Sequence, residues 1–486
     1  MTKTFDAGDV TLHRIREHIW EIPQEGEMRV PARLFASEAL LEEIAGDLTL
    51  QQLKNTTHLP GIQKYAICMP DGHQGYGFPV GGVAGIDAEN GCISPGAVGY
   101  DINCGVRMVK TNLEYDDVRG HETQLVEALF DAIPSGLGGG GVLENDMDAL
   151  EGALDRGVDW AHEAGYATRD DLRHCEDEGY RPDADPSAIS QKAKERGRDQ
   201  IGSLGSGNHF LEVQRVTDVF LDDVAEAYGL WEDQIVVLIH CGSRGLGHQT
   251  CTDYLRKIEQ AHAGLLEQLP DRELAAAPAG SQLANEYYGA MCAAINFAWV
   301  NRQLITYQTR QVFADVFETP WEDLEMELLY DVAHNIAKKE VHEIDGEPRE
   351  LYVHRKGATR AFPAGHNEVP EAYRDVGQPI IIPGSMGTGS YVLRGGSNSM
   401  ELTFGSTAHG AGRLMSRTQA KQEFWGEDVQ DDLRGQKVYV KAQSGATIAE
   451  EAPGVYKDVD EVMRVSDELG IGDKVVRVLP VCNIKG

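Results

Sequence analysis

Four segments of this chain share one design, in which an apolar run leads into a histidine beside glycines or polar residues. They are LGSGNHFLE with His209, VVLIHCGSRGLG with His240, LLYDVAHN with His334, and STAHGAGR with His409. Apolar runs that stop at glycines are typical of buried strands ending in tight turns. The fold must therefore hold polar side chains at several strand ends that are far apart in the sequence.

A fifth segment, VGYDINCGVR, places Asp101 three residues before Cys104, between glycines. With the four histidines, these two residues make six candidate metal ligands. Ligands that arrive from distant strand ends are typical of catalytic metal sites, and thiolate, imidazole and carboxylate together favour a first-row transition metal. Residue type alone leaves open which ligands share a metal and whether His409 is one of them. A lone histidine at a strand end is also a common hydrogen-bonded core residue, so the prediction depends on the combination.

Two glycine-rich stretches suggest anion binding. PGSMGTGSY, residues 383–391, offers backbone N–H groups and the hydroxyls of Ser385 and Ser390. In HGAGR, the glycines would let an anion come close to the backbone, beside the Arg413 guanidinium. Both resemble phosphate cradles, although neither ends in the Gly-Lys-Ser/Thr of a P-loop. Ordinary tight turns are the alternative for each stretch.

Strand-like and helical segments alternate without regular βαβ spacing, which predicts an α+β fold rather than a doubly wound sheet. We expect helices over much of 116–198 and one core helix over 282–317, with strands and turns in the C-terminal third. Residues 1–60 form an N-terminal element with helical stretches, packed on a large mixed catalytic domain at 61–486. We expect one domain overall, with its active site at strand ends and glycine-rich loops.

The formal charge of −34 over 486 residues argues against a nucleic-acid partner, because such proteins are usually basic. The acids are spread along the chain and only 16 residues are lysine, a pattern that favours adaptation of the surface to high internal salt. A function that repels anions is the alternative. Eight cysteines without paired spacing predict free thiols. The N-terminal stretch lacks a signal-peptide core, and no apolar run reaches the ~18–20 residues of a membrane span, so we expect a cytoplasmic protein without a membrane partner.

The ordered motifs resemble those of the RtcB-type RNA-splicing ligases, from Met69 to Lys485. The matching segments are MPDGHQGYGFPVGGVAG, GYDINCGVR, GSGNHFLE, HCGSRGLGH, YDVAHN, PGSMGTGSY, STAHGAGR and a lysine just before the C-terminus. The resemblance implies an enzyme that joins RNA ends carrying a 3′-phosphate or 2′,3′-cyclic phosphate to 5′-hydroxyl ends, with GTP and manganese. It also implies tRNA splicing, RNA repair, tRNA halves as substrates and archease as an activating partner.

The resemblance assigns roles to individual residues. It implies one Mn²⁺ at Asp101, Cys104 and His209, and a second at Cys104, His240 and His334, so that the Cys104 thiolate bridges both ions. His409 is then the nucleophile that carries GMP, assisted by Arg413 and Arg244. Within the nucleotide site, Glu212 and Lys485 would recognise guanine and Tyr456 would stack on it. The full set of implied nucleotide-binding residues is Asn208, Glu212, Asn335, Pro383, Gly384, Ser385, Met386, Ser390, Gly410, Ala411, Gly412, Tyr456 and Lys485.

Manganese follows from the resemblance alone, since a Cys/His site has a higher intrinsic affinity for zinc. Two other functions remain open: a dinuclear metallophosphoesterase that only hydrolyses cyclic or terminal phosphates, and a metal-stabilised RNA-binding protein. For the RNA itself, we expect a local basic groove near the motifs. Its candidates are Arg107, Arg244, Arg355, Lys356, Arg360 and Arg417.

Overall fold

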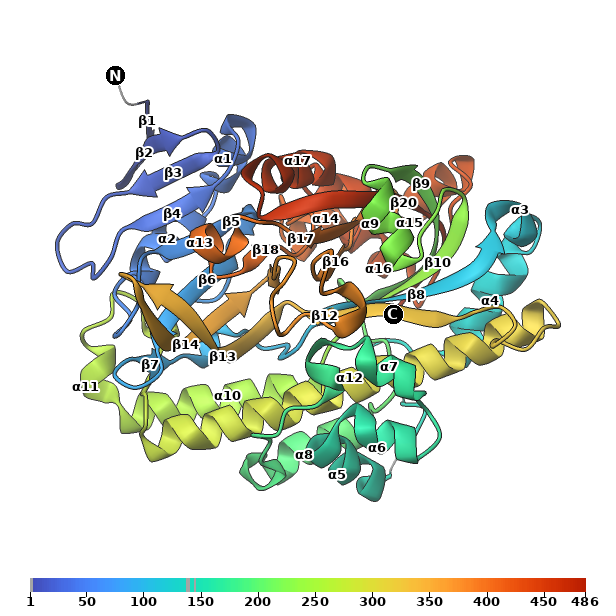
Figure 1. Ribbon diagram of the computed structural model, residues 1–486, viewed down its shortest axis with the longest axis horizontal. Coiled ribbons are helices and arrows are strands. Elements are labelled where there is room, and N and C mark those ends of the chain that lie inside the picture. Colours follow the sequence, from blue (N-terminus) through green and yellow to red (C-terminus); the bar gives the residue numbers. More distant parts are fainter. Residues whose placement is uncertain (1–2, 137–139, 144–145) are drawn as a thin grey trace.

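The protein, seen in a computed structural model that describes residues 3–136, 140–143 and 146–486, is built on two large sheets with helices around them (Figure 1). Nearly all strand pairs are antiparallel; β4 with β5 and β19 with β20 are parallel. Sheets of this kind, mixed with helices that do not alternate regularly with strands, confirm the predicted α+β class.

The first sheet has the strand order β1-β2-β3-β4-β5-β6-β14-β13. Its strands are β1 (Thr4–Ala7), β2 (Val10–Arg16), β3 (Ile19–Ile22), β4 (Ala32–Phe35), β5 (Ala66–His73), β6 (Val80–Asp87), β14 (Glu347–Lys356) and β13 (Asn335–Ile344). Segments 270 residues apart in sequence thus meet where β6 pairs with β14, as in the pair Ala84–His354.

The second sheet has the order β12-β8-β10-β9-β20-β17-β16, and β19 pairs with β20 beside this path. Its strands are β12 (Glu327–Ala333), β8 (Gly105–Glu114), β10 (Gln234–Cys241), β9 (Phe210–Val219), β20 (Gly472–Lys485), β17 (Ser390–Gly395), β16 (Pro379–Ile382) and β19 (Tyr439–Ala442). Strands β12, β8, β10 and β9 are the ones that carry or border the predicted metal ligands. Short strands β15 (Ala358–Arg360) and β18 (Ser406–Ala408) form a separate pair, and β18 ends directly before His409.

Two long helices, α10 (Arg244–Ala261) and α12 (Gln282–Val316), lie side by side under the sheets (Figure 1). Helix α12 starts where the Ser281 hydroxyl accepts a hydrogen bond from the Ala284 backbone N–H, a standard N-cap. Most of its side chains are buried around the whole circumference, as expected for a helix that crosses a core. The predicted helix over 282–317 is thereby confirmed.

The predicted helices of 116–198 are also confirmed, and they precede β9. They are α3 (Tyr115–Val118), α4 (Glu122–Ala132), α5 (Met147–Arg156), α6 (Val158–Glu163), α7 (Arg169–Arg173) and α8 (Gln191–Arg198). Two other expectations were incomplete. The N-terminal element holds strands β1–β4 besides helices α1 (Glu38–Ile44) and α2 (Thr49–Thr56), and the C-terminal third is more helical than predicted. Its helices include α14 (Arg417–Glu423), α15 (Gly426–Gly435), α16 (Gly445–Glu450) and α17 (Val459–Leu469).

Both departures have the same cause. Strands of four to seven residues and helices of six to eleven are too short to show a clear period, and their boundaries depend on caps such as Ser416 and Ser444. Residues 1–60 share one hydrophobic core with later strands, since Leu34 and Phe35 cluster with Ile67 and Val353. The boundary at residue 60 stays a prediction.

None of the helices among the described residues combines the length and the apolar character needed to cross a bilayer. The eight cysteines are free and buried, as predicted.

Candidate active site

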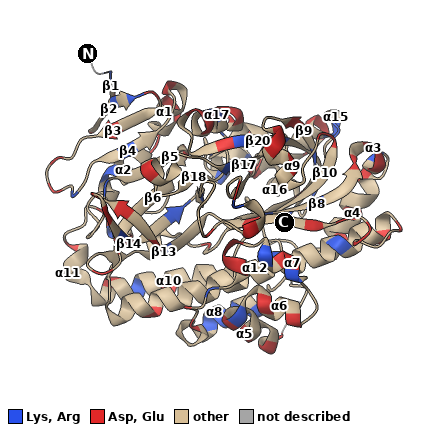
Figure 2. Cartoon of the chain, in the orientation of Figure 1, with Lys and Arg blue, Asp and Glu red and all other residues tan. Residues whose placement is uncertain are grey.

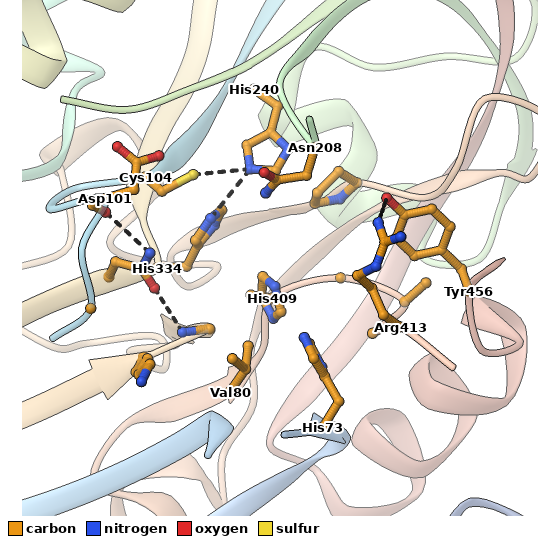
Figure 3. A pocket seen from close by; sticks show the side chains of 18 of the residues that line it. His73, Val80, Asp101, Cys104, Asn208, His240, His334, His409, Arg413 and Tyr456 are labelled. Atoms are coloured by element: carbon orange, nitrogen blue, oxygen red, sulfur yellow. Dashed lines mark hydrogen bonds between the residues drawn. The ribbon is translucent and has the colours of Figure 1, made fainter. Parts of the chain in front are cut away.

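The sequence-predicted residues gather around one cavity of about 270 Å³ between the two sheets (Figure 3). The cavity is bordered by the loop before β8, by the ends of β5 and β10, and by the segments that follow β12 and β18. Predicted residues that line it are Asp101, Cys104, Asn208, His240, His334, Asn335, Pro383, Gly384, His409, Gly410, Ala411, Gly412, Arg413 and Tyr456. The strand ends therefore converge as the histidine segments predicted.

Cys104 lies at the centre of the candidate metal ligands. Its Sγ is 3.4 Å from His209 Nε2 and 3.3 Å from His240 Nε2, and His240 Nε2 is 3.3 Å from His334 Nε2. The Asp101 carboxylate lies 2.8 Å from His209 Nε2. Two ligand groups result, Asp101–Cys104–His209 and Cys104–His240–His334, each with donor atoms within 4.8 Å of one another. The thiol belongs to both groups, so one sulfur can contact two ions.

The electrostatics of these groups suit a cation. Burial, with the nearby Asp101 carboxylate, raises the pKa of the Cys104 thiol well above its usual value, so without a cation the sulfur keeps its proton. Burial also lowers the pKa of His240 and His334 well below the ordinary value, which keeps both imidazoles neutral and free to coordinate. A divalent ion would displace the thiol proton, because only the thiolate is a strong ligand.

The Asp101–Cys104 loop is held from behind by helix α12. The Arg302 guanidinium donates to the Asn103 carbonyl at 2.9 Å and to its side-chain oxygen at 3.0 Å, and it also forms a bidentate pair with Asp331. Asn103 is fully buried with φ of 52°, a left-handed conformation that a side chain seldom adopts without support. Arg302 therefore stabilises the turn that brings Asp101 and Cys104 to the same cavity.

We expect Arg302→Leu to destabilise the protein by about 3–5 kcal/mol, because the buried Asp331 keeps only its pair with Arg107 and the Asn103 and Cys241 carbonyls lose a buried donor. We also expect it to weaken metal binding. Arg310→Leu is the matched control: Arg310 lies on the same helix and forms a buried pair with Asp171, away from the ligand loop. The melting temperature should fall for both variants. Metal affinity, measured by titration calorimetry, should fall only for Arg302→Leu. Equal metal affinities in the two variants would contradict the role given to Arg302.

His409 is oriented by Asp71, a residue that the sequence did not single out. The His409 Nδ1 donates to Asp71 Oδ2 at 2.6 Å, and the same oxygen accepts the backbone N–H groups of His409 and Gly410. Since the carboxylate holds the proton on Nδ1, the His409 Nε2 lone pair is left free. The ring of His334 lies 4.9 Å from that of His409, centre to centre. A ring nitrogen with a free lone pair thus lies beside the second ligand group.

The predicted guanine-binding acid, Glu212, belongs to a buried polar cluster that reaches Gly384 of the cavity lining. Glu212 accepts hydrogen bonds from Gln214, at 2.7 Å, and from Asn483. Gln214 also donates to the Ser390 hydroxyl at 3.0 Å, and that hydroxyl accepts the Gly384 N–H. Burial raises the pKa of Glu212 to about 7 despite these hydrogen bonds and the nearby Lys485 ammonium. The carboxyl thus changes charge near neutral pH.

Glu451, also absent from the sequence prediction, connects three of the predicted site residues: Arg413, Tyr456 and Lys485. It is fully buried and forms ion pairs with Arg413 at 3.0 Å, Arg417 at 3.4 Å and Lys485 at 3.5 Å, and it accepts a hydrogen bond from Tyr456. Lys485 ends strand β20, so the C-terminal lysine is docked rather than frayed. This acid holds three predicted site residues in place.

Some predicted residues lie outside the cavity lining. Met386 is buried in a small core with Ala420 and Leu433, and Ser385 hydrogen-bonds to Thr388. Arg244 contacts the outer edge of His209, with its guanidinium 3.5 Å from Nδ1. The structure thus places Arg244 beside a ligand rather than at the cavity.

The predicted basic groove is wrong. Arg107, Arg355 and Arg360 are almost fully buried and pair with Asp331, Glu340 and Glu176 respectively. A buried guanidinium needs a buried partner, and these partners come from distant strands and turns that the local sequence does not reveal. The buried Lys356 donates to three backbone carbonyls, and of the six candidates only Arg417 is half-exposed at the cavity mouth. Figure 2 shows acidic positions scattered over many helices and strands.

Comparisons with known proteins agree with the site. The family model described as tRNA-splicing ligase RtcB matches residues 52–486. The chain is 54% identical to the tRNA-splicing ligase RtcB of Thermococcus kodakarensis, across 98% of this chain and 99% of that protein. It is 51% identical to the Aeropyrum pernix protein of the same name (97% and 99% covered) and 49% identical to that of Nanoarchaeum equitans (98% and 100%). The chain therefore belongs to the RtcB family of tRNA-splicing ligases.

Proposed function

We propose that this protein is a GTP-dependent RNA ligase that joins a 3′-phosphate or 2′,3′-cyclic phosphate end to a 5′-hydroxyl end, with tRNA halves as substrates. The main support for this proposal is the hydrogen bond between His409 and Asp71. It leaves a nucleophilic nitrogen of His409 in the same cavity as the two candidate ligand groups. Membership of the family supports RNA ligation over the metallophosphoesterase alternative, which needs no nucleophilic histidine.

In the first step, His409 Nε2 attacks the α-phosphorus of GTP. An N–P bond forms, the bond to the β-phosphate oxygen breaks, and pyrophosphate leaves. The imidazole becomes positively charged, and the Asp71 carboxylate at 2.6 Å stabilises that charge. A 2′,3′-cyclic phosphate is first hydrolysed: water attacks the phosphorus, the bond to the 2′-oxygen breaks, and a 3′-phosphate with a free 2′-hydroxyl results. GMP then passes to an oxygen of the RNA 3′-phosphate, restoring neutral His409. The 5′-hydroxyl finally attacks the RNA phosphorus and GMP departs.

Asp101, Cys104 and His209 would hold one divalent ion, and Cys104, His240 and His334 would hold a second. A thiolate, neutral imidazoles and a carboxylate within 4.8 Å are a suitable donor set. When bound, such ions supply Lewis-acid stabilisation of phosphoryl charge. We propose manganese as the ion. Arg413 borders the cavity and adds positive charge there, while Arg244 and Asp101 position His209 from its two sides.

Guanine would be recognised by the buried polar cluster of Glu212 and Lys485 beside the cavity. The Glu212 carboxylate can accept from guanine N–H groups, Lys485 can donate to its oxygen, and Tyr456 can stack at the cavity wall. Backbone N–H groups of residues 383–386 and 410–412, with the Ser385 and Ser390 hydroxyls, would hold phosphates and ribose. Asn208 and Asn335 border the same cavity.

GTP use should depend on pH through Glu212. Guanine N–H groups need the ionised carboxylate, and with a pKa of about 7 the group is protonated as the pH falls below that value. We therefore expect KM for GTP to rise up to about tenfold for each pH unit below 7. Glu212→Gln should have a high KM that varies much less with pH. Histidine-labelling kinetics from pH 5.5 to 8.5 measure this, and an equal pH dependence in the variant would contradict it.

The function is tested by incubating the protein with α-labelled GTP and Mn²⁺. A ligase acquires acid-labile label on His409 and joins a cyclic-phosphate RNA strand to a 5′-hydroxyl strand only when GTP is present. A phosphoesterase opens the cyclic phosphate and acquires no label, and a binding protein does neither. The assays are run at low and high salt, because the charge of −34 was interpreted as an adaptation of the surface to high salt. Adding archease tests whether a partner protein raises turnover.

A further inference from the structure

One imidazole of the cavity lining has no role in the chemistry above. His73, the last residue of β5, lies beside His409, with ring centres 6.4 Å apart and ring planes inclined by 27°. Figure 3 shows the two rings next to each other on one side of the cavity, away from Cys104. Neither candidate ligand group includes His73.

Asp71 orients both imidazoles. Its carboxylate accepts from His409 Nδ1, and its backbone carbonyl lies 3.0 Å from His73 Nδ1. A carbonyl oxygen can only accept a hydrogen bond, so His73 Nδ1 must carry the ring proton. The Nε2 of neutral His73 is then an acceptor, and among the described residues the only hydrogen bond of this ring is the one from Nδ1.

We propose that His73 binds substrate, with its Nε2 accepting a hydrogen bond from a ribose hydroxyl close to the phosphorus that His409 attacks; this rests on the proposed ligase function. Ionised phosphate oxygens are acceptors and would be repelled by this lone pair. Ribose hydroxyls are the donors that both GTP and an RNA end bring near a reacting phosphorus.

The environment of His73 keeps it an acceptor. Burial lowers the pKa of His73 to about 4, and the facing His409 lowers it further, so the ring is neutral at the pH of the reaction. A base this weak is poorly matched to removing a proton from the 5′-hydroxyl. The residue thus discriminates substrates by hydrogen bonding rather than by proton transfer.

The test removes the hydroxyl and the acceptor separately. GTP, 2′-deoxyGTP and 3′-deoxyGTP are compared in histidine labelling, and 3′-phosphate strands ending in ribose or 2′-deoxyribose are compared in joining. A 3′-phosphate strand is used because a cyclic phosphate has no free 2′-hydroxyl. The same comparisons are made with His73→Phe, which keeps a ring without an acceptor, and with His73→Gln, which can restore one.

In the wild type, loss of the recognised hydroxyl should lower kcat/KM by about 2- to 10-fold, the effect of one hydrogen bond. In His73→Phe this preference should fall to about one, and His73→Gln should recover part of it, with metal content and melting temperature unchanged in both. The arm that shows the effect identifies whether the hydroxyl belongs to GTP or to RNA.

A wild type that labels and joins but shows no hydroxyl preference in any arm overturns this inference alone. So does a preference that His73→Phe retains in full, or a loss of metal from that variant. A wild type that neither labels nor joins overturns the proposed function as well.

Discussion

Replacing Cys104 with alanine abolishes histidine labelling by GTP, with an expected loss of at least about 10³-fold. The sulfur is shared by both ligand groups, at 3.4 Å from His209 and 3.3 Å from His240, so its removal leaves neither group with three ligands. Losing metal-ion stabilisation of a phosphoryl transfer removes several kcal/mol. Metal content measured by mass spectrometry should fall together with labelling.

Two controls make this result specific. His409→Ala should also lose labelling but keep its metal, because His409 belongs to neither ligand group. Cys251→Ala removes another buried thiol, on helix α10 and in a different core, and should change neither property. Retained labelling in Cys104→Ala, or metal loss in His409→Ala, would show that the ligands have been assigned wrongly.

Asp71→Asn should slow histidine labelling by about 10²- to 10⁴-fold, the range seen when the acid behind a catalytic histidine is made neutral. The amide oxygen can still accept from His409 Nδ1 and from the backbone N–H groups of His409 and Gly410, so the geometry can persist. What disappears is the negative charge that stabilises the imidazolium formed with GMP. Single-turnover labelling measures the loss, while metal content should stay at the wild-type level.

Asp71→Ala provides the comparison, because it removes charge and hydrogen bonds together and leaves two buried N–H groups without their acceptor. We expect it to be slower than Asp71→Asn and less stable to heat. Both variants keep the backbone carbonyl that orients His73, so residual labelling should show the same hydroxyl preference as the wild type. If Asp71→Asn labels His409 at a rate close to that of the wild type, charge stabilisation by Asp71 is excluded.

The convergence of the histidine segments was predictable because each follows a buried strand, and strand ends of one sheet lie close together. The same reasoning could have included His73 and Asp71: the run AICMPDGHQG also leads from apolar residues into an acid and a histidine beside glycine. Nothing in that run, however, predicts that Asp71 faces His409, 338 residues later. That contact depends on how β5 and the segment after β18 come together.

The arginines show the opposite limit. Arg355 and Arg360 lie between the YDVAHN and PGSMGTGSY motifs in sequence, which suggested RNA contacts. They occupy buried positions of β14 and β15, however, and pair with distant acids in the interior. Glu451 escaped prediction for a related reason: its partners Arg413 and Arg417 come from one segment and Lys485 from another, at the end of β20. Burial of charge is decided by such long-range pairs, which local sequence does not encode.

The candidate ligands Asp101, Cys104, His209 and His240 belong to the second sheet or its bordering loops, whereas His409 is anchored through Asp71 to β5 of the first. A small slippage of one sheet against the other would therefore separate His409 from Asp101, Cys104 and His209. It would also shift His334, which joins β12 of the second sheet to β13 of the first. Inactive variants collected at random should fall into two phenotypes, metal-free chains and metal-loaded chains that cannot be guanylylated. Compensating second-site changes for the latter should cluster where the sheets meet.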